Sequence, residues 1–194
     1  MERIFVVPAG VLPRFQGFMP ADDAVIERIK ERGFFADRQS VENDFSLKQI
    51  IPYTVFTMDG RIFTMRRLAK GGESRLHNKG SIGIGGHINH EDGEPIEDGL
   101  KREFFEEVDY QGTFQPRLLG FINDDSDDVG KVHFGLAYVV KGDAGIEVRE
   151  KNVLEGAMSG PDDINRDALE KWSRIVLDAL MNDSDFRHLK TLPD

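Results

Sequence analysis

The chain has 194 residues, 39% of them hydrophobic, which is enough for one folded domain with a sizeable core. Its 35 acidic and 25 basic side chains give a formal net charge of −10, which disfavours binding to nucleic-acid backbones. The absence of cysteine excludes disulfides and thiolate metal sites, so we expect a cytoplasmic protein. No apolar run approaches the roughly 18–20 residues that cross a bilayer, so we expect no membrane partner.

The first 48 residues contain a short apolar run at 4–7, which predicts a strand, and then a loop rich in proline and glycine to residue 20. A helix is expected over 24–32, because aspartates precede it and Gly33 follows its basic end. We interpret residues 1–48 as an elaboration packed on a main domain at 49–182, with a tail at 183–194. A homodimer is an open alternative, in which this elaboration packs between copies.

The pattern changes from residue 49. Strands are predicted at 50–57 and 61–67, joined by the two-residue turn Asp59-Gly60. A polar, glycine-rich loop at 68–80 and a third strand at 81–86 follow. A helix is then expected to begin at Pro95 and to reach Val108, with Gly99 explained by a close contact between helix and sheet.

The C-terminal part predicts three more strands, at 117–122, 132–140 and 146–148. Asn123 to Gly130 reads as an acidic turn, and its spacing does not match an EF-hand calcium loop. Pro161 is expected to start a closing helix over about 162–181. The whole pattern predicts an α/β (α+β) domain.

The expected helix from Pro95 concentrates negative charge. Glu103, Glu106 and Glu107 share one face by their i, i+3, i+4 spacing, and an apolar set shares another. Three like charges on one face repel each other. Because hard divalent cations prefer oxygen ligands, this face is a candidate metal site. The alternative is an ordinary solvated helix face.

These residues resemble the signature of the Nudix (MutT-like) hydrolase family, which is Gly, five residues, Glu, seven residues, then Arg-Glu-apolar-any-Glu-Glu-any-Gly-apolar. Glu94 and the run Arg102-Glu103-Phe104-Phe105-Glu106-Glu107 fit its second half. There are two departures: seven residues separate Gly86 from Glu94, and Asp109 replaces the usual glycine. The match covers about 25 residues, and the surrounding strand order is also similar to the family fold, an α/β/α sandwich with a mixed sheet.

The resemblance implies hydrolysis of a pyrophosphate bond in a nucleoside diphosphate linked to another group, by attack of water on phosphorus with Mg²⁺ or Mn²⁺. It implies metal ligation and catalysis by Glu103, Glu106 and Glu107, with a backbone carbonyl of Gly85 or Gly86 as a further ligand. Glu94 and Arg102 would hold the loop and orient the carboxylates.

Family members often draw a general base from a downstream loop, which here points to Glu155, with Glu150 and Asp124 as competitors. Basic residues before the third strand, together with His87, are the candidates for contacts to substrate phosphates: Arg66, Arg67, Arg75, His77 and Lys79. Their alternative is a solvated hairpin rim.

Two other functions occur in the same fold. An isoprenyl-diphosphate isomerase uses a cysteine in the related fold, and this chain has none. A non-catalytic module that senses a nucleotide would tend to lose the metal glutamates, all three of which are present. The specific substrate is left open, because loops decide specificity in this fold.

Overall fold

The computed structural model describes residues 2–68 and 79–186. The chain forms two compact units. The first unit consists of Met1–Tyr53, Gly85–Glu103 and Leu118–Tyr138, and the second unit consists of Thr54–Ile84, Phe104–Arg117 and Val139–Asp194. Four elements contribute residues to both units: strand β4 (Leu47–Met58), helix α3 (Pro95–Glu107), strand β9 (Pro116–Asn123) and strand β10 (His133–Lys141).

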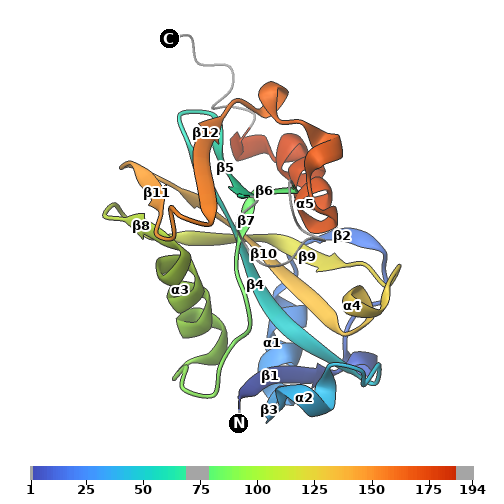
Figure 1. Cartoon of the computed structure of the whole chain (residues 1–194). Helices are drawn as coiled ribbons and strands as arrows, with labels where there is room; N and C mark the ends of the chain where they lie inside the picture. Colours follow the sequence, from blue (N-terminus) through green and yellow to red (C-terminus); the bar gives the residue numbers. More distant parts are fainter. Residues whose placement is uncertain (1, 69–78, 187–194) are drawn as a thin grey trace. The chain divides into compact units, whose positions relative to one another are not determined.

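The first unit is built around β4 and β10. Strand β1 (Arg3–Pro8) pairs antiparallel with β3 (Phe34–Asp37) and with the start of β4 (Figure 1). The hydrogen-bonded order continues from β4 through β10 and β9 (Pro116–Asn123) to β2 (Gly17–Pro20). The shorter elements of this unit are α1 (Asp23–Arg32), α2 (Arg38–Val41), α4 (Asp128–Lys131) and η1 (Ala9–Val11).

Helix α1 confirms the helix predicted at 24–32. It begins after Asp22, whose side chain accepts a hydrogen bond of 2.9 Å from the Ala24 N–H. It ends at Gly33, but φ there is −74°, so no left-handed residue is needed. Glycine is required for space instead, because a Cβ at this position would lie 2.0 Å from Cζ of Phe5.

The second unit contains the predicted hairpin. Asp59 (φ 50°) and Gly60 (φ 70°) turn β4 into β5 (Arg61–Arg67), with Met58 paired to Arg61, as a two-residue turn requires. The remaining elements of this unit are β6 (Gly80–Ser81), β7 (Gly83–Ile84), β8 (Val108–Tyr110), β11 (Ile146–Val148), β12 (Leu154–Ser159), η3 (Pro161–Asp163), η4 (Arg166–Ala168) and α5 (Lys171–Asn182). Strands β8 and β11 pair antiparallel, and β12 pairs with β5.

Two sequence expectations are wrong here. The third strand predicted at 81–86 is two short strands, β6 and β7, and it stops before Gly85. The closing helix predicted from about residue 162 begins only at Lys171. Leu169 is buried and forms a parallel bridge with Gly80, and the Glu170 N–H donates to the Gly80 carbonyl. This pairing holds Leu169 and Glu170 in an extended conformation between η4 and α5, so a continuous helix cannot run through them.

Each unit has its own apolar core. In the first unit, Phe121, Phe134 and Leu136 pack with side chains from α1 and β1. In the second unit, Phe56, Phe63 and Phe104 lie at the centre. Helices are interspersed among runs of consecutive strands along the chain, as expected for the α/β (α+β) class. The predicted division of the chain at residue 48 stays a prediction. In the part of the chain that the structure describes, no helix is long and apolar enough to cross a membrane.

Candidate active site

Helix α3 carries the three candidate metal glutamates. It spans Pro95–Glu107, so Glu103, Glu106 and Glu107 are on one continuous helix at the predicted spacing. Phe104, on the opposite side, is fully buried and stacks on Phe56 with ring centroids 6.4 Å apart. Glu106 is exposed, and Glu103 and Glu107 are half-buried. The apolar side of α3 is therefore anchored, while its carboxylates face away from this core.

The exit of α3 explains one departure from the signature. The helix passes directly into β8, in which Asp109 is exposed and lies opposite Glu147 of β11. An extended residue at this point needs no positive φ. Aspartate can therefore stand where a helix that ended in a left-handed turn would require glycine.

Gly85 and Gly86 are needed for close approach. A Cβ on Gly85 would lie 1.9 Å from the carbonyl oxygen of Pro52, which belongs to β4. A Cβ on Gly86 would lie 2.3 Å from Oε2 of Glu103. The main chain at Gly86 therefore runs directly beside the carboxylate of Glu103. This agrees with the prediction that a carbonyl here and Glu103 bind the same metal ion.

Arg102 connects the loop before α3 to Glu103. Its Nε and Nη2 donate to the two carboxylate oxygens of Asp92, at 2.9 and 3.0 Å. Its Nη1 donates to Oε1 of Glu103 at 2.8 Å, and Nη2 also donates to the carbonyl of His87 at 2.8 Å. The hydrogen bonds to Asp92 are the main reason why the pKa of Arg102 is raised. One guanidinium thus fixes both the loop and the carboxylate.

Asp92 is a site residue that sequence reasoning missed. Its side chain is only 5% exposed, and it accepts a further hydrogen bond from the Asn89 N–H at 2.8 Å. Glu94, which was expected to hold the loop, is exposed. Its N–H donates to Oδ2 of Asp98 at 2.8 Å.

Gly99 is explained by the loop rather than by the sheet. A Cβ on Gly99 would lie 2.9 Å from Cγ1 of Ile88 and 3.1 Å from Oδ2 of Asp92. The expected contact between helix and sheet is therefore wrong. The missing side chain lets the loop at 87–92 lie flat on α3.

The comparisons with known proteins agree with this geometry. No family model matches the chain. Protein YmaB of Bacillus subtilis (strain 168) is 38% identical over 182 residues, covering 86% of this chain and 88% of YmaB. The crystal structure of Tm1382, classed as a Nudix hydrolase, matches with a TM-score of 0.82 and 32% identity, over 93% of this chain and 99% of Tm1382. The chain belongs to the Nudix hydrolase family.

A more distant solved structure shares the Nudix fold alone. It is a bifunctional NMN adenylyltransferase/ADP ribose pyrophosphatase from Francisella tularensis, complexed with AMP and a manganese ion. Its TM-score is 0.50 at 13% identity, over 70% of this chain and 41% of that one. The predicted fold class and the predicted enzyme class, a Nudix-type pyrophosphohydrolase, are confirmed by family membership.

The Nudix signature also contains the signal that would have found Asp92. Five residues separate Gly86 from Asp92, which is the spacing between the signature glycine and its first acidic residue. Aligned in this way, the additional two residues fall between Asp92 and α3, and a shorter carboxylate replaces glutamate. In this structure Asp92 accepts the hydrogen bonds of Arg102, and the loop-holding role expected of Glu94 stays a prediction.

The donor set of the Nudix helix fits a divalent cation chemically, because carboxylate and carbonyl oxygens are the ligands that magnesium and manganese take. Within residues 2–68 and 79–186, no group of three or more histidine, aspartate or glutamate side chains is close enough to hold an ion as the side chains stand. Glu103 is engaged with Arg102. Carboxylates of α3, together with a main-chain carbonyl of Gly85 or Gly86, would hold the ion.

His87, a predicted substrate contact, is held inside the first unit. Its Nε2 lies 2.7 Å from Oε1 of the buried Gln49, and its ring centroid is 5.6 Å from that of His133. Burial, assisted by the positive charge of Arg38, lowers the pKa of His87 to about 4. The ring is therefore neutral near pH 7. Burial also lowers the pKa of His133.

This depressed pKa predicts a loss of stability in mild acid. Protonation of His87 favours the unfolded chain, in which its pKa is about 6.5. The contribution of His87 to the free energy of unfolding should be constant above that pH and should fall by about 3 kcal/mol as the pH drops to 4. Urea unfolding with EDTA across this range would measure the slope. His87→Gln should make the slope shallower, and an unchanged slope would contradict the assignment.

Glu155 is not on a loop, contrary to expectation. It lies in β12, opposite Arg66 of β5, and Nη2 of Arg66 donates to Oε2 of Glu155 at 2.7 Å. Both side chains are 57% exposed. The sequence Leu154–Ser159 is poor in β-branched residues, and its strand depends on pairing with β5. Glu150, a competing base, is exposed in the turn before β12.

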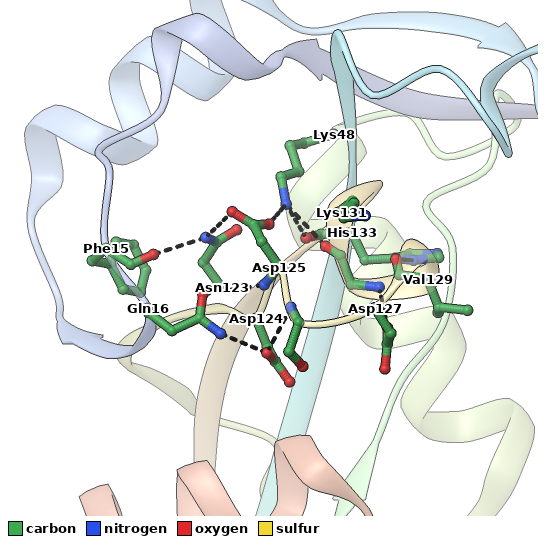
Figure 2. Close-up of polar contacts among 12 residues, drawn as sticks. Phe15, Gln16, Lys48, Asn123, Asp124, Asp125, Asp127, Val129, Lys131 and His133 are labelled. Atoms are coloured by element: carbon green, nitrogen blue, oxygen red, sulfur yellow. Dashed lines mark hydrogen bonds and ion pairs between the residues drawn. The ribbon is translucent and has the colours of Figure 1, made fainter.

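Asp124, the other competing base, belongs to a tightly bonded turn after β9 (Figure 2). It is buried and accepts from Nε2 of Gln16 at 2.6 Å. The neighbouring Asp125 pairs at 2.6 Å with Nζ of the buried Lys48, which also donates to the carbonyl of Gly130. The acidic run thus supplies structural contacts in the first unit, including the cap of α4 by Asp127.

Of the remaining predicted substrate contacts, the structure describes only some. Arg67 and Lys79 are exposed in the second unit. Arg75 and His77 lie outside the described residues. The basic group therefore stays a prediction as a set, with Arg66 already paired to Glu155.

Proposed function

We propose that this Nudix hydrolase cleaves, with a divalent metal, a pyrophosphate bond in a nucleoside diphosphate linked to another moiety. The observation that carries the proposal is the acidic face of α3, with Glu103 held between Arg102 and the main chain of Gly86. Family membership adds that enzymes of this kind act on such pyrophosphates. The AMP and manganese in the Francisella tularensis structure support a nucleotide-type substrate and a divalent ion.

The proposed metal ligands are Glu103, Glu106, Glu107 and a carbonyl of Gly85 or Gly86. When bound, Mg²⁺ or Mn²⁺ would neutralise the charge on the phosphate oxygens. Arg102 orients Glu103 and keeps the loop at 87–92 fixed, because it bonds Asp92 and His87 at once. This fixed arrangement limits the reorganisation needed when substrate binds.

Glu155 remains our proposed general base, accepting the proton of the attacking water. Its exposed carboxylate is accessible to water, whereas that of Asp124 is buried against Gln16. Release of Glu155 from Arg66 would leave Arg66 available to a substrate phosphate. Arg67, Lys79, Arg75, His77 and His87 complete the proposed substrate contacts. We further propose a cytoplasmic location, which suits a chain without cysteine.

A substrate panel tests this function. ADP-ribose, dinucleoside polyphosphates, nucleotide sugars and damaged nucleoside triphosphates should be assayed for release of a nucleoside monophosphate or phosphate, with magnesium, with manganese and with EDTA. Metal-dependent release from at least one class is expected. Tight binding of a nucleotide without turnover across the panel would favour the alternative, a non-catalytic sensing module.

Magnesium should also raise the thermal stability of the protein. The glutamates of α3 repel one another in the absence of a cation, and an ion that binds only the folded chain stabilises it by mass action. At a hundredfold excess over Kd, the gain is about 2.7 kcal/mol, or several degrees in Tm. Differential scanning fluorimetry with and without magnesium would measure it. Glu106→Gln should reduce the gain, while Glu31→Gln, an exposed carboxylate on α1, should not.

A further inference from the structure

A cavity of about 300 Å³ lies within the first unit, where α1, β3 and the start of α3 meet. Its walls are mostly apolar, and they are formed by Phe5, Phe34, Phe35, Pro95 and Ile96. Phe34 is 44% exposed, so this wall of the cavity is open to solvent. We call this space the Phe34 cavity. Its volume is at the lower end of the range for small-molecule sites.

The walls of the Phe34 cavity are held in place. The Phe35 ring packs against Phe5 with centroids 5.3 Å apart, and against His90 at 5.2 Å with the rings edge to face. Gly33 has no side chain that could fill the space, and its main chain lies against the Phe5 ring. The cavity is therefore largely preformed, which lowers the entropy cost of binding a rigid ligand.

The charged residues of the Phe34 cavity give it a negative balance. Lys30, Glu94 and Glu97 are its three charged lining residues. Nζ of Lys30 bonds Oε1 of Glu97 at 2.8 Å, and this bond raises the pKa of Lys30, so the ammonium stays charged. One cation against two carboxylates leaves a net charge of −1. Such a rim attracts N–H donors and repels phosphate.

The Phe34 cavity is separate from the carboxylate face. Ile96 and Glu103 are two turns apart on α3, about 10 Å. The loop at 87–92 packs on Gly99 between them, through Ile88 and Asp92. A ligand in the cavity would therefore not touch Glu103.

We propose that the Phe34 cavity binds a small planar nitrogen heterocycle, such as an amino-substituted base without its phosphates. The ring would pack on the phenylalanine side chains, and its N–H groups would donate to Glu94 and Glu97. This accessory site does not depend on the proposed hydrolysis, because none of its residues is a proposed metal ligand or base. Its ligand class follows from the aromatic walls and the negative rim.

Adenosine is the probe for this site. Titration into the full-length, EDTA-treated protein, followed by ¹H–¹⁵N NMR, should shift the amide signals of Gly33 and Phe34 saturably. Phe34→Ala should weaken adenosine binding by about tenfold, within the range for loss of a base–aromatic stack. The matched control is Phe45→Ala, because Phe45 is a similarly exposed phenylalanine (51%) that does not line the cavity.

Charge gives a second readout that does not depend on Phe34. Glu94→Gln should weaken adenosine binding, and AMP should shift the Gly33 and Phe34 signals no more strongly than adenosine does. Three results would overturn the proposal: no shift of these amides at millimolar adenosine, equal binding by the Phe34→Ala variant with its fold intact, or tighter binding of AMP than of adenosine at these amides.

Discussion

Glu107→Gln is expected to lower kcat/KM for the preferred nucleoside diphosphate derivative by about a thousandfold, or roughly 4 kcal/mol of transition-state stabilisation. Glutamine keeps the size of the side chain but removes the charge that a divalent ion requires. Because Glu107 is half-buried at the end of α3, where its carbonyl accepts from the Arg149 N–H, the amide should be tolerated structurally. Steady-state assays with saturating magnesium would measure the loss.

Glu155→Gln is the comparison for this experiment. A general base contributes typically 10²–10⁴-fold, and an exposed carboxylate on β12 can be replaced in part by another group or by water. The loss should therefore be smaller than for Glu107→Gln. Nearly wild-type turnover by the Glu107→Gln protein would refute the metal-site assignment, whereas a larger loss at Glu155 would reverse the order of the two roles.

Asp92→Ala is expected to lower the free energy of unfolding by about 3 kcal/mol. The change leaves the Arg102 guanidinium without the carboxylate that takes two of its hydrogen bonds, and it also removes the acceptor for the Asn89 N–H. Breaking a buried pair by removing one partner costs about 3–5 kcal/mol, and the 24% exposure of the Arg102 side chain places the expected value at the lower end. Urea denaturation would measure it.

Glu94→Ala is the matched control, two residues away and exposed. A surface substitution of this kind should change stability by no more than about 0.5 kcal/mol. The pair of variants therefore decides which acidic residue holds the loop. If Glu94→Ala were the more destabilising of the two, the sequence-based assignment would be right and the Arg102–Asp92 contact would not be the dominant one.

The elements that sequence predicted well have local causes. The start of α1 depends on Asp22, and the hairpin depends on Asp59-Gly60, so each is readable within a few residues. The spacing of the α3 glutamates is likewise local. These signals were sufficient for the fold class and for the acidic face of the candidate site.

The elements that sequence missed depend on distant partners. Strand β12 forms because six of its residues pair with β5, and nothing within Leu154–Ser159 favours a strand. The late start of α5 depends on the bridge between Leu169 and Gly80. Asp92 was overlooked because its importance comes from burial against Arg102, whereas Glu94 matched a spacing. For β12 and α5, a contact with a distant part of the sequence outweighed the local pattern, whereas Asp92 could have been found from its five-residue spacing to Gly86.

The backbone of the loop at 87–92 is joined to the beginning of the chain. The Phe5 N–H donates to the Ile88 carbonyl at 2.9 Å, and the His90 N–H donates to the Arg3 carbonyl at 3.1 Å. Strand β1 therefore pairs with the loop through backbone hydrogen bonds, as two adjacent strands do, although more than 80 residues separate them in sequence. The N-terminal segment is consequently not a dispensable appendage. A shortened chain that began at residue 9 would lose the strand that pairs with this loop. The loop would then no longer hold Arg102, and through it Glu103, in a fixed position.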